Sequence, residues 1–217
     1  MEQLINILMV VILLTNLLLL GSSRLGTCIP TLGFQGILLG LMLPVLLLSP
    51  EGINIHTLVL VFISIPLRGL LFPWFLFRVI KQTNIRREIE PFISYPVSIF
   101  LGILALVLAF WMNSRLAGTP IPILHPLMLP VAFYTILVGL ILIVSRKLAI
   151  NQVLGYIVME NGMYVLGIAF SGEVHLLLDL GVLMDVFVAV FVMSIAIYRI
   201  SREFDHTDVN QLKYLKD

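Results

Sequence analysis

Cysteine and histidine are scarce in this sequence, and their scarcity limits the chemistry that the chain can perform. The 217 residues include one cysteine, Cys28, and four histidines that stand far apart. A single cysteine permits no internal disulfide, and no spacing in the chain fits a zinc or iron–sulfur site. The sequence also has no nucleophile paired with a base and no phosphate-binding loop. We therefore expect no catalytic site, no metal and no redox cofactor within this chain.

Charged residues are also few, and apolar residues take their place. Only 12% of the residues are charged, 60% are hydrophobic, and the formal net charge is +1. So small a charge argues against a nucleic-acid partner, and so apolar a composition excludes a soluble protein. The composition predicts an all-α integral membrane protein.

Seven apolar segments are long enough to cross a bilayer, which takes about 20 helical residues. The predicted spans are 3–20, 30–48, 56–79, 92–112, 127–145, 150–170 and 176–198. The second contains Gly33, Gly36 and Gly40, a spacing that predicts close helix packing. We expect the first span to be retained, because it begins with Glu2 and is followed by no small-residue cleavage site.

The predicted chain is one transmembrane domain, 1–217. Spans one to five occupy 1–145, spans six and seven form a hairpin over 146–200, and 201–217 are a cytoplasmic tail. Arg115 falls on one side of the predicted membrane, Arg68 lies within the third span, and the other eleven basic residues share the opposite side: Arg24, Arg78, Lys81, Arg86, Arg87, Arg146, Lys147, Arg199, Arg202, Lys213 and Lys216. Because basic loops stay cytoplasmic, this distribution predicts an outer N-terminus and a cytoplasmic C-terminus.

Ionisable residues inside the predicted spans are candidates for an ion path. They are Glu160 and its neighbour Asn161 in the sixth span, Asp179 and Asp185 in the seventh, and Arg68 in the third. Glu160 lies 14 residues from Arg146, and Asp185 lies 14 residues from Arg199, or ~21 Å along a helix in each case. An ionisable group at such depth costs at least ~2.5 kcal/mol and usually faces other helices or an ion pathway.

Two prolines flank the arginine of the third span. Pro66 and Pro73 remove backbone donors on either side of Arg68, which predicts a kinked helix bearing a buried arginine. The aromatic residues beside them would suit a quinone, although such residues more often anchor a helix at the lipid interface: Phe72, Trp74 and Phe75.

Several motifs together resemble component E of hydrogenase-4-type complexes. They are RK at 146–147, NQVLGYIVMENG at 151–162, LGVLMDVFVAVFVM at 180–193 and DVNQLK at 208–213, with LRGLLFP at 67–73 as a weaker match. The last two spans are in turn similar to the small three-helix subunit of complex I and to the C subunit of Mrp antiporters. If Asn161 is placed on the asparagine of their motif, the glutamate of those relatives falls near Ile157, one helical turn before Glu160.

The resemblance implies a membrane subunit of a group 4 [NiFe]-hydrogenase or formate hydrogenlyase complex in a bacterial or archaeal cytoplasmic membrane. Its partners would be antiporter-like and complex-I-like anchor subunits and a hydrophilic hydrogenase arm. The NiFe centre and the iron–sulfur clusters would belong to those partners.

Two interpretations of the buried charges stay open. Glu160, Asp185 and Arg68 would form part of a proton or sodium path in a redox-driven pump, or Arg68 would neutralise one acid as a structural tie in a scaffold subunit. A subunit of a cation/proton antiporter without a redox role is a further alternative. A free-standing transporter is disfavoured, because the chain is short and shows no inverted repeat.

Overall fold

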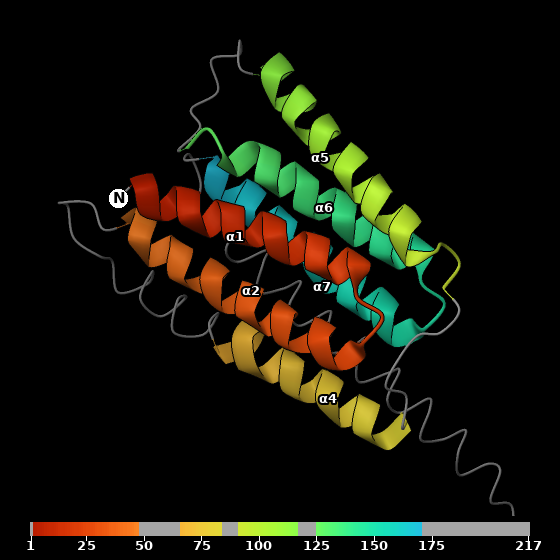
Figure 1. Ribbon diagram of the computed structural model, residues 1–217. Helices are drawn as coiled ribbons and strands as arrows, with labels where there is room; N and C mark the ends of the chain where they lie inside the picture. Colours follow the sequence, from red (N-terminus) through yellow and green to blue (C-terminus); the bar gives the residue numbers. More distant parts are fainter. Residues whose placement is uncertain (1, 48–65, 84–90, 117–124, 171–217) are drawn as a thin grey trace, which may run out of the picture.

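The computed structural model describes residues 2–47, 66–83, 91–116 and 125–170, and every regular element within these ranges is helical (Figure 1). The all-α class is therefore confirmed. The helices are α1 (Glu2–Gly21), α2 (Leu25–Leu47), a π-helical segment η1 (Leu67–Leu71), α4 (Phe72–Thr83), α5 (Tyr95–Leu116), α6 (Met128–Ser145) and α7 (Ala149–Ala169).

Four of these helices are long and apolar enough to cross a membrane: α1, residues Leu25–Met42 of α2, α5 and α6. They confirm a membrane protein. The number of seven spans and the orientation stay predictions, because the first part of the third predicted span and the whole of the seventh lie outside the described residues.

Three helices extend well beyond their predicted spans, α2 at its start and α4 and α5 at their ends, and α4 continues to Thr83 instead of residue 79. α2 begins at Leu25 instead of residue 30, because the Arg24 carbonyl already accepts hydrogen bonds from the backbone N–H groups of Thr27 and Cys28 at 3.0 and 3.1 Å. α5 continues to Leu116 instead of residue 112, since polar residues can extend a helix after its apolar run has ended. Apolar length therefore marks where a span can be, and backbone hydrogen bonds decide where its helix ends.

α7 is the central helix of the described bundle. None of its residues is exposed, and it passes behind α1 in the view of Figure 1. Glycines bring its backbone against that of α6: a Cβ on Gly139 would lie 2.5 Å from the Met159 nitrogen, and one on Gly162 would lie 2.7 Å from the Ile136 nitrogen. Small residues allow such backbone contact between helices in membranes.

α2 makes a similar close approach to η1, as the glycine spacing predicts. A Cβ on Gly36 would lie 2.8 Å from the Arg68 carbonyl oxygen, and one on Gly33 would lie 2.7 Å from Cγ of Pro73. Pro73 follows Arg68 along the chain whereas Gly33 precedes Gly36, so η1 and α4 run antiparallel to α2. The contact places the backbone of Arg68 directly against the bundle.

The buried apolar side chains form two clusters, one toward each end of the helices. One cluster joins the end of α1, the start of α2, the second half of α6 and the first half of α7, and the other joins their opposite halves. Buried polar residues lie between the clusters, near the middle of the helices: Asn16, Gln35, Arg68, Thr135, Glu160 and Asn161. We call these six residues the polar layer.

The described basic loop residues gather at one end of the bundle. The ends of α1, α4 and α6 and the starts of α2, α5 and α7 meet at the right-hand end of the bundle in Figure 1. The residues at these helix ends include Arg24, Arg78, Lys81, Arg146 and Lys147, and we call this the basic end. Arg115 is in the last turn of α5, at the opposite end.

The α6–α7 contact supports a direct prediction. Replacing Gly139 with leucine should destabilise the protein by at least about 1–3 kcal/mol, because the new side chain would overlap backbone that cannot move independently. The measurement is unfolding of the purified protein in detergent. Gly26→Leu is the control, since a Cβ there meets no atom within 4 Å, and equal losses in the two variants would contradict the close contact.

Candidate functional site

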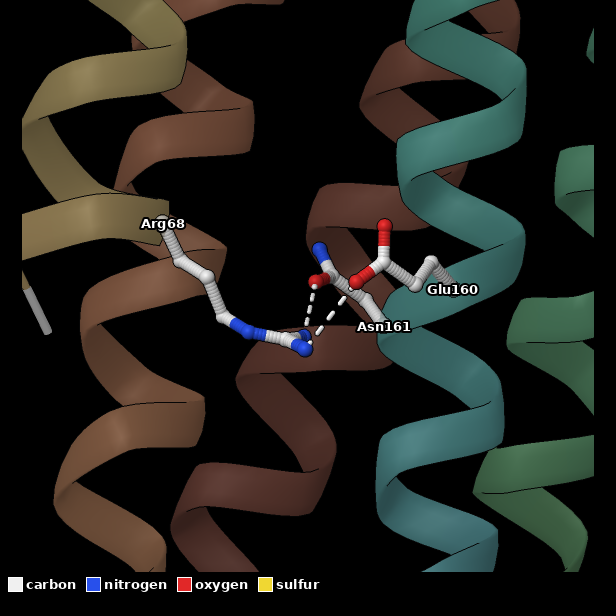
Figure 2. A network of polar contacts seen from close by, with 3 residues as sticks. All are labelled: Arg68, Glu160 and Asn161. Carbon is white, nitrogen blue, oxygen red and sulfur yellow. Dashed lines mark hydrogen bonds and ion pairs between the residues drawn. The ribbon is translucent and has the colours of Figure 1, made fainter. Parts of the chain in front are cut away.

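The site centres on an ion pair buried inside the bundle. Arg68 Nη2 lies 3.0 Å from Glu160 Oε1, and the two residues are only 4% and 2% exposed (Figure 2). Arg68 comes from η1 and Glu160 from the centre of α7, so 92 positions of sequence separate the partners. In a medium that solvates charge poorly, such a pair is stable only because each group neutralises the other.

Arg68 has two further contacts on the same face of α7. Its Nη1 donates to Asn161 Oδ1 at 3.3 Å, and Figure 2 shows the Asn161 side chain beside Glu160, both turned toward the guanidinium. One turn farther along α7, the Tyr164 ring lies under the guanidinium, with 4.6 Å between the guanidinium carbon and the ring centroid. An arginine over an aromatic face is stabilised by the ring quadrupole. Arg68 is therefore held by the Glu160 carboxylate, the Asn161 side-chain amide and the Tyr164 ring.

The wide helical turn at Leu67–Leu71 carries Arg68. Pro66 precedes it and Pro73 follows it, and proline cannot donate the backbone hydrogen bond that a regular α-helix needs. Single π-helical turns inside helices often occur at functional sites. The predicted burial of Arg68 is confirmed, the helix at this point is a π-helical turn, and the kink stays a prediction.

The polar layer continues from Asn161 across the bundle. Asn161 Nδ2 lies 3.5 Å from Gln35 Oε1 on α2, and Gln35 Nε2 donates to Asn16 Oδ1 on α1 at 2.8 Å. Asn16 Nδ2 donates in turn to Thr135 Oγ1 on α6 at 2.8 Å, and Thr135 donates to the Val131 carbonyl at 2.7 Å. The hydrogen bonds link η1, α7, α2, α1 and α6 in one connected network.

Sequence analysis missed Asn16, Gln35 and Thr135. They are neutral, so they do not interrupt an apolar segment as a charge does. Neither the hydropathy of α1 and α2 nor the glycine spacing of α2 reveals them. A usable signal was present in Gln35, the single amide of α2, and in Asn16 of α1, because a polar side chain within an apolar helix requires a partner on another helix.

Two of the predicted site residues, Asp179 and Asp185, lie outside the described residues, so their proximity to Glu160 stays a prediction. The acidic residues that the structure does describe are Glu160 and Glu2, at the start of α1. Within the described part of the chain, no three His, Cys, Asp or Glu side chains form a group that could hold a metal ion.

Arg146 has a structural role that its position in a loop does not suggest. It is 2% exposed, its Nη2 donates to the Leu20 carbonyl at 2.7 Å, and its guanidinium carbon lies 4.2 Å from the centroid of the Tyr95 ring. A cation at the end of α1 satisfies a carbonyl that lacks a partner in the helix and complements the helix dipole. Arg146 therefore ties α1 and the start of α5 to the α6–α7 connection.

The amide network can be tested at Gln35. Gln35→Leu should lower the free energy of unfolding by about 1–3 kcal/mol, because it leaves buried polar atoms of Asn16 and Asn161 without their partner. Unfolding in mixed detergents measures this change. Gln3→Leu, on an exposed position of the neighbouring α1, is the matched control. A Gln35 variant as stable as the control would show that the network contributes little.

Comparison with known proteins connects this site to a family. Residues 127–217 match the family of NADH-ubiquinone/plastoquinone oxidoreductase chain 4L. The matched region contains α6 and α7, and with them Thr135, Glu160 and Asn161. Arg68 and Gln35 lie outside it.

Individual proteins are also similar to this chain. The chain is 26% identical over 214 residues to an uncharacterized protein of Mycobacterium tuberculosis, an alignment that covers 95% of this chain and 93% of the relative. It is 35% identical over 88 residues to hydrogenase-4 component E of Escherichia coli K12 and of Shigella flexneri, which is 41% of this chain and 41% of each relative. No solved structure matches the chain. The predicted resemblance to hydrogenase-4 component E is thus confirmed over part of the chain, and residues 127–217 match the chain 4L family.

Proposed function

We propose that this chain is an integral membrane subunit of a hydrogenase-related, complex-I-like redox complex and contributes to proton or sodium translocation. The chain 4L match and the likeness to hydrogenase-4 component E support the type of complex, and the apolar helices support its place in a membrane. The other membrane subunits would be antiporter-like and anchor subunits. A hydrophilic arm would hold the NiFe centre and the iron–sulfur clusters.

The observation that carries translocation is the buried pair of Arg68 and Glu160. Ionisable residues inside a membrane protein are expensive and commonly belong to ion pathways. Glu160 is also the described carboxylate that lies within the chain 4L match. A carboxylate in this position is a group to which a proton can be delivered and from which it can be withdrawn.

The contacts of Arg68 allow Glu160 to gain and lose a proton while Arg68 stays in place. When a proton neutralises Glu160, the guanidinium loses this ion pair but retains the Asn161 oxygen at 3.3 Å and the Tyr164 ring at 4.6 Å. Both contacts are to neutral groups, so neither depends on the protonation of Glu160. We infer that Arg68 keeps its position in both states and that the proton alone changes the charge of the site.

Helices outside the chain 4L match supply two polar side chains near this carboxylate. The counter-ion Arg68 comes from η1 and the amide of Gln35 from α2, whereas the matched region supplies Glu160 and Asn161. In this proposal the first part of the chain supplies the counter-ion of a carboxylate that the second part provides.

A scaffold subunit is the second candidate, and the same ion pair favours it. Removing one partner of a buried pair typically costs ~3–5 kcal/mol, whereas replacing both partners is often nearly neutral. A pair that only joins η1 to α7 would therefore tolerate replacement of both residues by neutral ones. An antiporter subunit without a redox role is the third candidate, and co-purification of this chain with a hydrogenase arm would exclude it.

The test is redox-driven ion pumping in membrane vesicles that contain the assembled complex. With Glu160→Gln, pumping should fall at least about tenfold while redox turnover and assembly persist, because the amide cannot release a proton. Glu2→Gln is the control, since Glu2 is the exposed carboxylate at the start of α1. Unchanged pumping in assembled Glu160→Gln complexes would contradict the proposal.

The double variant Arg68→Gln with Glu160→Gln separates the two roles if a single variant fails to assemble. It removes both charges of the described ion pair together. The translocation proposal expects an assembled complex without pumping. An assembled double variant that pumps at the wild-type rate would identify the pair as a structural tie.

A further inference from the structure

α4 has an exposed face that combines aromatic and basic side chains. Phe77 and Arg78 follow Trp74 by three and four residues, and Lys81 follows them by four and three, so the four residues lie on one helix face, and all are exposed. The opposite face carries Phe72 and Leu76, which are 2% and 1% exposed and belong to an apolar cluster shared with α2. We call the four exposed residues the α4 face, and α4 itself is at the edge of the described helices (Figure 1).

The residues of the α4 face are ordered by depth. The basic end of the bundle is where α4 ends, and Lys81 lies seven residues beyond Trp74, or ~10 Å along the helix. The guanidinium carbon of Arg78 lies 5.5 Å from the centroid of the Trp74 ring. Tryptophan at the level of the lipid glycerol, with cations farther out among the headgroups, is the arrangement typical of a membrane interface.

The charge of this face is not balanced by a described carboxylate. Of the two acids in the described ranges, Glu2 is at the start of α1, which lies at the opposite end, and Glu160 is paired with Arg68. Arg24, at the start of α2, adds a third exposed cation at the same end of the bundle. The α4 face therefore presents positive charge and apolar surface together.

We propose that the α4 face binds an anionic phospholipid of the leaflet at the basic end. Arg78 and Lys81 hold the phosphate and the acidic headgroup, and Trp74 and Phe77 pack along the glycerol and the first acyl carbons. A lipid fits this face better than an acidic protein segment, because the apolar side chains lie on the membrane side of the cations, in the order of the parts of a phospholipid. Each basic side chain near an anionic membrane surface adds to the attraction. This inference does not depend on the proposed function.

The opposite end of the bundle offers an internal comparison. Trp111 and Arg115 on α5 repeat the spacing of Trp74 and Arg78, with 5.4 Å between the guanidinium carbon and the ring centroid, and both residues are exposed. α5 ends at Leu116, so no second cation follows one turn later on that helix. The pair on α5 therefore has the aromatic residue and one cation, but not the two-cation headgroup contact.

The experiment measures lipid retained by the purified full chain in native mass spectrometry. The chain is incubated with equal amounts of phosphatidylglycerol and phosphatidylcholine in a mild detergent. The wild type should retain more phosphatidylglycerol than phosphatidylcholine. In the double variant Arg78→Gln with Lys81→Gln, the ratio of the two retained lipids should fall at least about tenfold. Arg115→Gln should retain it. Arg78→Lys, which keeps the charge, should also retain most of it, and Lys81→Gln alone provides a milder variant if the double variant does not fold.

Three outcomes would overturn the proposal. Equal losses in the Arg115 variant and the double variant would mean that the lipid responds to overall charge and not to the α4 face. An unchanged preference in the double variant would place the lipid elsewhere. Inorganic phosphate that binds to the wild type as tightly as phosphatidylglycerol, and is lost in the double variant, would identify a free-anion site in place of a lipid site.

Discussion

The hydrocarbon core of a bilayer offers no solvent for charge, and this constraint explains how the polar side chains of the bundle are placed. Arg68 and Glu160 neutralise each other at 3.0 Å, and each amide beyond them has a partner on another helix. The network ends where Thr135 donates to the Val131 carbonyl. It also ends where Thr15, which accepts a hydrogen bond from Gln35, donates to the Ile12 carbonyl. Backbone oxygens near the end of the network accept without requiring a further donor, so the layer can stop inside the protein.

Glycine makes this layer possible by letting backbones approach. Arg68 reaches α7 because η1 lies against Gly36, where any side chain would overlap the Arg68 backbone. Glu160 stays in the interior because Gly139, Gly155 and Gly162 hold α7 tightly against α6. The composition of α7 follows from its position: a helix with no exposed residue need not be apolar on a lipid-facing side.

Much of this arrangement could be predicted from the sequence, because charge is conspicuous in an apolar chain. The helical class, most helix ends and the gathering of loop cations at one end follow from hydropathy and from lysine and arginine positions. The pairing of Arg68 with Glu160 was one interpretation among several, since 92 residues separate them and depth alone does not show which helices are neighbours. Arg146 was read as a loop charge, yet its burial depends on Leu20 and Tyr95, which no local pattern connects to it.

The polar layer crosses the bundle between two apolar clusters, and this has a consequence for how the helices can move. Lipid tails are as apolar as leucine side chains, so apolar packing alone distinguishes poorly between one axial register of two helices and the next. A shift of one helical turn, ~5.4 Å, would move Gln35 away from both Asn16 and Asn161 and leave several buried groups unpaired. The layer therefore opposes sliding of one helix along another. Motions of α1 and α2 that keep these hydrogen bonds are tilting or rotation about the level of the polar layer.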